Sequence, residues 1–110
     1  MYINDIEKYR KEGSTDEWYI SKLLDKSISG LSPEQAYLEI DAIVEVLLKE
    51  KEWDIFLNHC QYILRLARLA NTTEIPLKLG QNLHALQAKI TEFDLVNHSE
   101  VKGLYAWFRI

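Results

Sequence analysis

The chain has few of the residues that interrupt or cross-link a fold. Among its 110 residues there are one cysteine, two prolines and four glycines. The single cysteine, Cys60, excludes an internal disulfide framework and a cysteine-rich zinc site, and it fits a reducing compartment. Because strand-and-turn architectures use glycine and proline at their corners, this scarcity favours long helices with short connections. We expect a cytoplasmic, all-α protein.

Long uncharged apolar runs are also missing. No stretch approaches the roughly 20 residues that a membrane helix needs, so no stable membrane insertion is expected. The opening "MYINDIEKYRKEG" mixes acids with bases and lacks an apolar run of signal-peptide length, so it predicts neither an export signal nor a transit peptide.

The common enzyme signatures are absent as well. The chain has no glycine-rich phosphate loop, no nucleophile elbow and no His-Glu-x-x-His pair. We therefore expect a protein that is not an enzyme and that requires no cofactor.

Charge is distributed unevenly along the chain. The net charge is −4, but the residues up to Asp54 carry 13 acids and 7 bases, and those from Ile55 onward carry 4 acids and 6 bases. An acidic half does not suit general nucleic-acid binding, which depends on Lys and Arg neutralising phosphates. It would suit a basic protein partner. The alternative is that these acids form the solvated outer faces of helices.

Apolar residues recur at helical spacing through most of the chain. The first helix covers Tyr2–Glu12 and ends at Gly13. Thr15 can cap the next, with Asp16 and Glu17 in its first turn and Gly30 after its end. We expect the buried face of this helix to consist of Trp18, Ile20, Leu23, Leu24 and Ile28.

The third helix has the strongest start signal. Ser32 is an N-cap, Pro33 takes the first helical position, and Gln35 completes a capping box. The apolar stripe of this helix cannot continue, because its next positions are all polar: Lys51, Asp54 and Asn58. We therefore expect a tight turn near residues 52–54 and another helix from about Asp54 to Ala70.

In the last third, "NTTEIP" predicts a helix start, with Thr72 or Thr73 as cap and Pro76 in the first turn. The residues that follow form a coiled-coil-like seam at alternating spacings of four and three: Leu79, Leu83, Leu86, Ile90 and Phe93. Ser99 can cap a last helix that ends at Phe108. The whole pattern predicts a single domain over residues 1–110, a compact antiparallel bundle of five or six helices.

A weak internal periodicity offers one variation on this fold. Pro33 and Pro76 lie 43 residues apart, and apolar positions match at that offset. The spacing is within the range of HEAT-like helix pairs. Any two amphipathic helices can be aligned this way, so chance agreement is the alternative.

Two residue pairs and one cysteine are candidate sites. Asp41 and Glu45 share a helix face as a metal-binding pair might, but no other helix brings matching ligands, so no metal site is expected. Arg65 and Arg68 could grip a carboxylate or phosphate, or could simply complement the helix dipole. Cys60 lies on an apolar helix face, where a free cysteine is usually a core residue.

The chain closes on an aromatic segment, "EVKGLYAWFRI". In a helix from Ser99 to Phe108, Tyr105 lies on the apolar face and Trp107 lies off it. Tryptophan and arginine are over-represented at binding hot spots. Trp107 and Arg109, with Tyr105 beside them, are therefore predicted partner-binding residues, together with Asp41 and Glu45 of the acidic half. Simple packing is the alternative.

The segments "EIPLKLGQNLHALQAKI" and "VKGLYAWFRI" resemble the last long helix and the apolar C-terminal segment of small helical bacteriocin immunity proteins. The resemblance covers about a third of the chain. It implies a cytosolic antiparallel bundle without enzymatic activity, whose C-terminal part helps to select the bacteriocin. The acidic first half differs from many such proteins, which are basic.

The function that we expect is an immunity or inhibitor protein that binds and neutralises a toxin or its target. Its partner would be a basic toxin or a toxin receptor. The alternative is a helical adaptor or homo-oligomerisation module in which the Leu79–Phe93 seam packs between chains. Both a monomer and a homodimer are compatible with the sequence.

Overall fold

The computed structural model describes residues 2–16 and 18–110, which form α-helices and no strand. The helices are α1 (Tyr2–Glu12), α2 (Tyr19–Ile28), α3 (Pro33–Lys49), α4 (Trp53–Ala70), α5 (Leu77–Gln81), α6 (Leu83–Glu92) and α7 (Ser99–Phe108). The all-α class is confirmed. The expected number of five or six helices is corrected to seven within the described part of the chain, because the stretch after Pro76 breaks at Asn82.

Two glycines end the first two helices as expected. Gly13 and Gly30 take the left-handed conformations that follow α1 and α2, with φ of 67° and 84°. The predicted Thr15 cap is wrong, since α2 begins only at Tyr19. Asp16 organises this start instead: its carboxylate accepts the Trp18 backbone N–H at 2.9 Å. The predicted first-turn residue Glu17 lies outside the described residues.

The start of α3 confirms the capping box. The Ser32 hydroxyl accepts the Gln35 backbone N–H at 3.1 Å, and the Gln35 side chain accepts the Ser32 N–H at 2.8 Å. The expected turn before α4 is also present. It covers residues 50–52, slightly earlier than predicted, because α4 begins at Trp53.

The starts of α5 and α7 differ from the prediction. Pro76 occupies the N-cap position of α5, and neither Thr72 nor Thr73 caps it. Ser99 is the first helical residue of α7 rather than its cap, a position that His98 holds. The caps of both helices make no side-chain hydrogen bond, so contacts with the rest of the fold determine where these helices begin.

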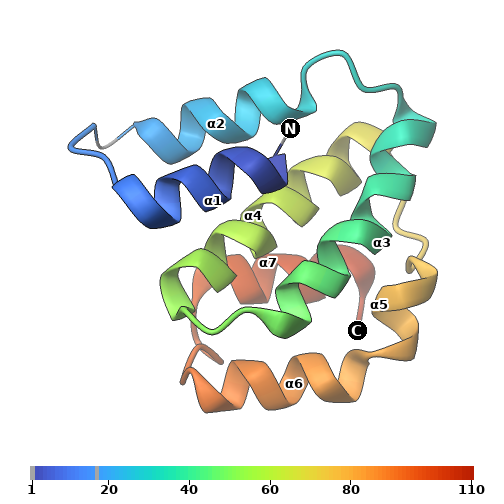
Figure 1. The fold of residues 1–110 in the computed structure, drawn as a ribbon. Helices are drawn as coiled ribbons and strands as arrows, with labels where there is room; N and C mark the ends of the chain where they lie inside the picture. Colours follow the sequence, from blue (N-terminus) through green and yellow to red (C-terminus); the bar gives the residue numbers. More distant parts are fainter. Residues whose placement is uncertain (1, 17) are drawn as a thin grey trace.

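The core lies around α3 and α4, which pack side by side and make the most extensive helix contact (Figure 1). Helix α7 packs on α4, whereas α5 and α6 contact α3. Helix α2 packs against α4, and α1 lies beside α2. The radius of gyration, 13.2 Å, matches that of a domain of this length. The most deeply buried aliphatic side chains come from six helices: Ile6, Leu24, Ile40, Ile43, Leu47, Ile63, Leu66, Leu79 and Leu104.

The predicted seam is used inside the molecule. Leu79, Leu86 and Ile90 are buried in the common core, and Leu83 and Phe93 pack against it. The central side chains of this seam are therefore covered within a single chain, which argues against the seam as the contact between two chains. Over the described part of the chain, no helix is long and apolar enough to cross a membrane.

Candidate functional site

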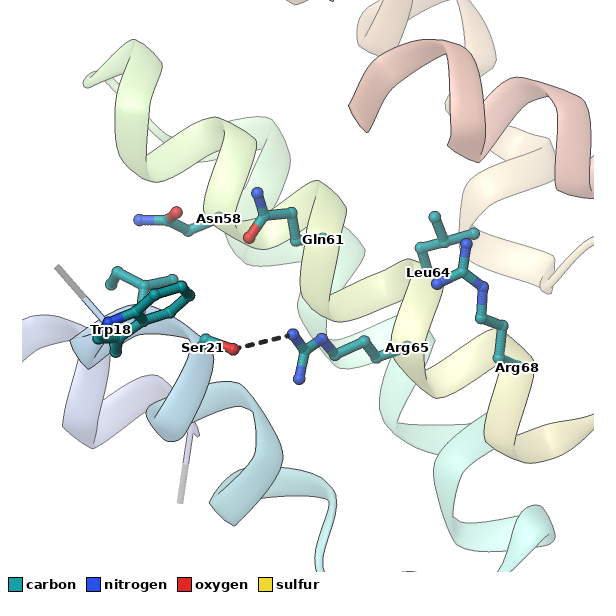
Figure 2. A pocket seen from close by; sticks show the side chains of 8 residues that line it. Trp18, Ser21, Asn58, Gln61, Leu64, Arg65 and Arg68 are labelled. Atoms are coloured by element: carbon teal, nitrogen blue, oxygen red, sulfur yellow. Dashed lines mark hydrogen bonds between the residues drawn. The ribbon is translucent and has the colours of Figure 1, made fainter. Parts of the chain in front are cut away.

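A groove of about 490 Å³ runs along the surface of α4 and opens to solvent (Figure 2). One wall comes from the start of α2, with Trp18 and Ser21. The floor is a face of α4, where the spacing of polar residues leaves side chains outside the core. Those side chains are Asn58, Gln61, Leu64, Arg65 and Arg68.

Trp18 is the most exposed aromatic side chain of this wall. It is 62% exposed, although tryptophan is a residue that folding normally buries to a large extent. Its backbone is fixed by the hydrogen bond to Asp16, which is in turn paired with Lys22 at 3.0 Å. The indole is therefore held on a defined turn and displayed at one end of the groove.

The two arginines of the groove differ in their partners. Arg65 forms an ion pair with Asp25 of α2 and reaches the Ser21 hydroxyl at 3.4 Å. Figure 2 shows Arg65 extending toward Ser21, whereas Arg68 extends past Leu64. Arg68 makes no hydrogen bond or ion pair with any described residue. The groove thus carries one positive charge that the described fold does not neutralise.

The two amides of the groove complete its polar lining. Gln61 donates from Nε2 to the Glu100 carboxylate of α7 at 2.8 Å, which leaves its own oxygen facing outward as an acceptor. Asn58 has no hydrogen-bond partner among residues 2–16 and 18–110. The groove therefore combines an indole, an unpaired guanidinium and an unpaired amide, which together suit a polar ligand with an apolar part.

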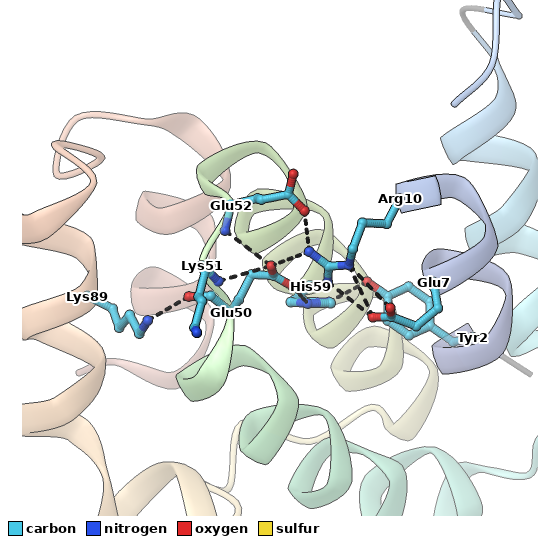
Figure 3. A network of polar contacts seen from close by, with 8 residues as sticks. All are labelled: Tyr2, Glu7, Arg10, Glu50, Lys51, Glu52, His59 and Lys89. Carbon is cyan, nitrogen blue, oxygen red and sulfur yellow. Dashed lines mark hydrogen bonds and ion pairs between the residues drawn. The ribbon is translucent and has the colours of Figure 1, made fainter. Parts of the chain in front are cut away.

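A second polar cluster lies inside the molecule, where the turn between α3 and α4 meets α1 (Figure 3). Its centre is Glu50, whose side chain is only 2% exposed. Arg10 grips both carboxylate oxygens, at 2.6 and 2.7 Å. The same guanidinium also contacts Glu7 and Glu52. Bidentate charge-assisted bonds of this kind are among the strongest in proteins.

His59 extends this cluster into the core. Its Nε2 lies 2.8 Å from Glu50 Oε1, and its Nδ1 lies 2.6 Å from the Tyr2 hydroxyl. Because the carboxylate can only accept, Nε2 carries the proton and Tyr2 donates to Nδ1. Tyr2 also stacks on Tyr62, with ring centroids 4.0 Å apart. The first residue of α1 is thus bound to the middle of α4.

The pKa values of this cluster follow from its surroundings. Burial raises the pKa of Glu50, but the hydrogen bonds from Arg10 and His59 outweigh it and lower the pKa to about 2. Burial lowers the pKa of His59 below its ordinary value, against the opposing effect of Glu50. At neutral pH the cluster therefore holds an ionised Glu50 and a neutral His59.

The cluster also fixes the backbone around it. Glu50 accepts the N–H groups of Lys51 and Glu52 at 3.0 and 3.2 Å, and its carbonyl accepts Lys89 of α6 at 2.5 Å. The Glu50 carboxylate is thus fully occupied by groups of its own chain. We infer a structural role that ties α1, α4 and α6 to the turn.

Sequence reasoning missed this cluster, although one signal was present. His59 is three residues after Phe56 and four before Ile63, so it lies on the apolar face of α4. A histidine at such a position needs a buried partner. The sequence did not indicate that the partner would be Glu50 in the preceding turn.

The predicted partner-binding residues are mostly engaged within the fold. The Asp41 carboxylate accepts the Lys78 backbone N–H at 3.0 Å, and Glu45 pairs with the Lys78 ammonium at 3.2 Å. Trp107 is partly buried and donates its indole N–H to the Thr72 carbonyl at 2.9 Å. These contacts hold α5 against α3 and α7 against the loop before α5.

Tyr105 and Arg109 lie at the end of α7. Tyr105 is partly buried against the core, and Arg109 is exposed in a left-handed conformation with φ of 58°. The structure does not bring these two residues together with Asp41 and Glu45 through any hydrogen bond or ion pair within its described part.

The acids of the N-terminal half are largely paired, and several partners come from the other half. Asp25 pairs with Arg65, and both Asp41 and Glu45 contact Lys78. The acids of this half whose side chains have neither an ion pair nor a hydrogen bond with any described residue are Glu12, Glu34, Glu39 and Asp54. The charge asymmetry along the sequence therefore serves in part to join the two halves of the fold.

Cys60 is fully buried, and burial raises the pKa of its thiol to about 12. A protonated, inaccessible thiol fits the core role expected from the sequence. Among the residues that the structure describes, no group of three or more His, Cys, Asp or Glu is placed to hold a metal ion.

Comparison of the chain with protein-family models, with curated proteins and with solved structures finds no match. The geometry of the groove and the pattern of unpaired side chains are therefore what a functional proposal has to rest on.

Proposed function

We propose that this chain is a non-catalytic binding protein of the immunity or inhibitor type, which neutralises a toxin or its target by occupying its surface. The observation that carries the proposal is the α2–α4 groove, which an exposed Trp18 at the N-cap of α2 and an unpaired Arg68 of α4 line together. Tryptophan and arginine are the residues most enriched among binding hot spots. We place the main contact surface at this groove.

The resemblance of the last third to bacteriocin immunity proteins supports the inhibitor reading. In such proteins the C-terminal part helps to select the bacteriocin, so Tyr105 and Arg109 stay predicted secondary contacts. The antiparallel arrangement of such bundles and a cytoplasmic location, which the free thiol of Cys60 suits, belong to this proposal.

The basic toxin expected from the charge distribution also stays a prediction. Its contacts would have to use the acids that the described fold leaves without an ion pair, such as Glu34 and Glu39 on α3. Asp41 already accepts the Lys78 backbone N–H, and Glu45 pairs with the Lys78 ammonium, so both are less available for a partner.

The proposal is tested by co-expressing the protein with the product of each adjacent gene and measuring complexes by size-exclusion chromatography with light scattering. A stable complex with a toxin or a toxin receptor is the expected result, and cells that make the complex should survive the toxin. If every adjacent product elutes separately and survival is unchanged, the inhibitor proposal fails.

The chain offers a matched control for the groove. Trp53 begins α4 and is 56% exposed, but it does not line the groove. Trp18→Ser should remove the complex while Trp53→Ser keeps it. Equal losses for both variants would place the contact surface elsewhere.

A second function, self-association, is favoured by exposed apolar side chains near the junction of α3 and α5. Leu38 is 70% exposed and Leu77 is 64% exposed. Leu38 lies one turn before Asp41, and Leu77 precedes Lys78, to which Asp41 is bonded. Sedimentation equilibrium tests this: a dimer that Leu38→Glu converts to a monomer would support it, and a monomer at high concentration would exclude it.

A further inference from the structure

We propose that the α2–α4 groove binds an acidic segment of the partner protein, with a carboxylate on Arg68 and an apolar or aromatic side chain on Trp18. This inference rests on the proposed function and specifies the chemistry of the partner. It is argued from the charge of the groove, the position of its polar groups and its length.

Arg68 differs from the other charged side chains of this surface because it has no ion-pair partner among the described residues. Arg65, one turn earlier on α4, is balanced by Asp25. The Glu100 carboxylate accepts hydrogen bonds from Gln61 and Ser99 and also contacts the His98 ring, so it is directed away from Arg68. No described side chain supplies a carboxylate to Arg68. Although the protein as a whole is acidic, this groove presents a positive charge that is free for an external anion.

The geometry of the donors favours a carboxylate on a peptide over a basic segment. A guanidinium binds carboxylates through two parallel hydrogen bonds. The unpaired Asn58 amide and the free Gln61 oxygen can bond to backbone groups of an extended chain, which has one donor and one acceptor per residue. A lysine or arginine of a partner placed beside Arg68 would be repelled by its unpaired charge.

The length of the groove gives a spacing rule. Trp18 lies toward the Asn58 end of α4, and Arg68 lies at the other end (Figure 2). Ten residues of helix separate Asn58 from Arg68, about 15 Å at 1.5 Å per residue. An extended peptide covers this distance with about four or five residues at roughly 3.3 Å each. The apolar side chain and the carboxylate should be separated accordingly.

The test uses the isolated protein and two capped peptides. In the first, one tryptophan and two glutamates are separated by about three glycine and serine residues, to match the length of the groove. In the second, lysines replace the glutamates. Binding is followed by NMR, through the indole signal of Trp18 and the guanidinium signal of Arg68.

The expected result is that the glutamate peptide shifts both signals, that added salt weakens its binding, and that the lysine peptide leaves them unchanged. Arg68→Gln should weaken binding of the glutamate peptide by about tenfold or more, the loss expected for a charge-assisted pair. Lys11→Gln, which alters an exposed cation of α1 outside the groove, should leave binding unchanged.

Three results would overturn the inference: no shift with the glutamate peptide, equal shifts with the lysine peptide, or an Arg68 shift with inorganic phosphate that equals the peptide's effect and leaves Trp18 unmoved. The last would assign a simple anion site. Because no partner is used, the outcome is independent of the inhibitor test. If the protein binds the peptide but no toxin or receptor, this inference stands and the proposed function fails.

Discussion

At the scale of single residues, the Glu50 cluster is the most consequential feature of the fold. A buried carboxylate is tolerated only when it is paired and its remaining acceptor positions are filled. Arg10, His59 and two backbone N–H groups fill them here. Removing any one partner should therefore leave a buried charge or dipole without compensation.

The first prediction concerns Glu50→Gln. The variant removes the charge that Arg10 and His59 face, so we expect the free energy of unfolding to fall by about 3 kcal/mol, as when one partner of a buried ion pair is lost. Urea unfolding followed by circular dichroism measures it. Glu12→Gln, at an exposed site without an ion pair to any described residue, should change stability by less than about 0.5 kcal/mol. A Glu50 variant as stable as the control would contradict the account.

The second prediction concerns pH. In the folded protein the pKa values of His59 and Glu50 both lie below their ordinary values. The unfolded chain therefore binds more protons as the pH falls, and stability must fall with it. The loss from His59 begins near its ordinary pKa of 6.5, and that from Glu50 between 4.5 and about 2.

Unfolding measured between pH 7 and pH 3 checks this prediction. The wild-type protein should lose stability progressively, and Glu50→Gln should lose less than the wild type below pH 4.5, because its amide does not titrate. Parallel curves for the two proteins would show that Glu50 does not have the lowered pKa on which the account depends.

At the scale of elements, some helix starts are determined by neighbouring residues and others by contacts with distant parts of the chain. Ser32 and Gln35 cap α3 with groups from the same few residues, and the sequence predicted them correctly. The start of α5 depends on Asp41, which is 37 residues away in the chain. Thr72 and Thr73 had the right local chemistry, but the fold supplied a partner that no local pattern contains.

The third prediction concerns this distant contact. Asp41→Ala should cost about 1 kcal/mol, similar to the loss of an N-cap, because the Lys78 N–H at the start of α5 loses its acceptor. The same substitution should accelerate hydrogen exchange of the Lys78 backbone amide. Glu45→Ala should cost clearly less, since exposed ion pairs contribute about 0 to 1 kcal/mol. Equal losses of stability for the two variants would show that the charge of the Lys78 ammonium, rather than the hydrogen bond of its backbone N–H, stabilises this contact.

At the scale of the whole molecule, the candidate site could be predicted only in part. The sequence showed Arg65 and Arg68 as a pair with possible affinity for anions. It did not show the groove, because the groove exists only where α2 lies against α4 and leaves Trp18 exposed. Conversely, Trp107 is a residue type enriched at binding hot spots, but in the fold its indole N–H donates to the Thr72 carbonyl.

The fourth prediction separates folding from binding in the groove. Arg65→Ala should lower stability by up to about 1 kcal/mol, because Arg65 pairs with Asp25 across two helices. Arg68→Ala should leave stability within about 0.5 kcal/mol of the wild type, since it has no partner among the described residues. Thermal unfolding of the two variants checks this, and a larger loss for Arg68→Ala would show that its side chain is structural.

The central claim is that the groove, rather than the C-terminal aromatic segment, makes the main contact with the partner. The most direct measurement is the dissociation constant of the complex, by calorimetry, for Arg68→Glu and Arg109→Glu. The account predicts a loss of affinity of about thirtyfold or more for Arg68→Glu, a hot-spot effect of about 2 kcal/mol, and a clearly smaller loss for Arg109→Glu, a secondary contact. The reverse order would contradict it and assign the contact to the end of α7.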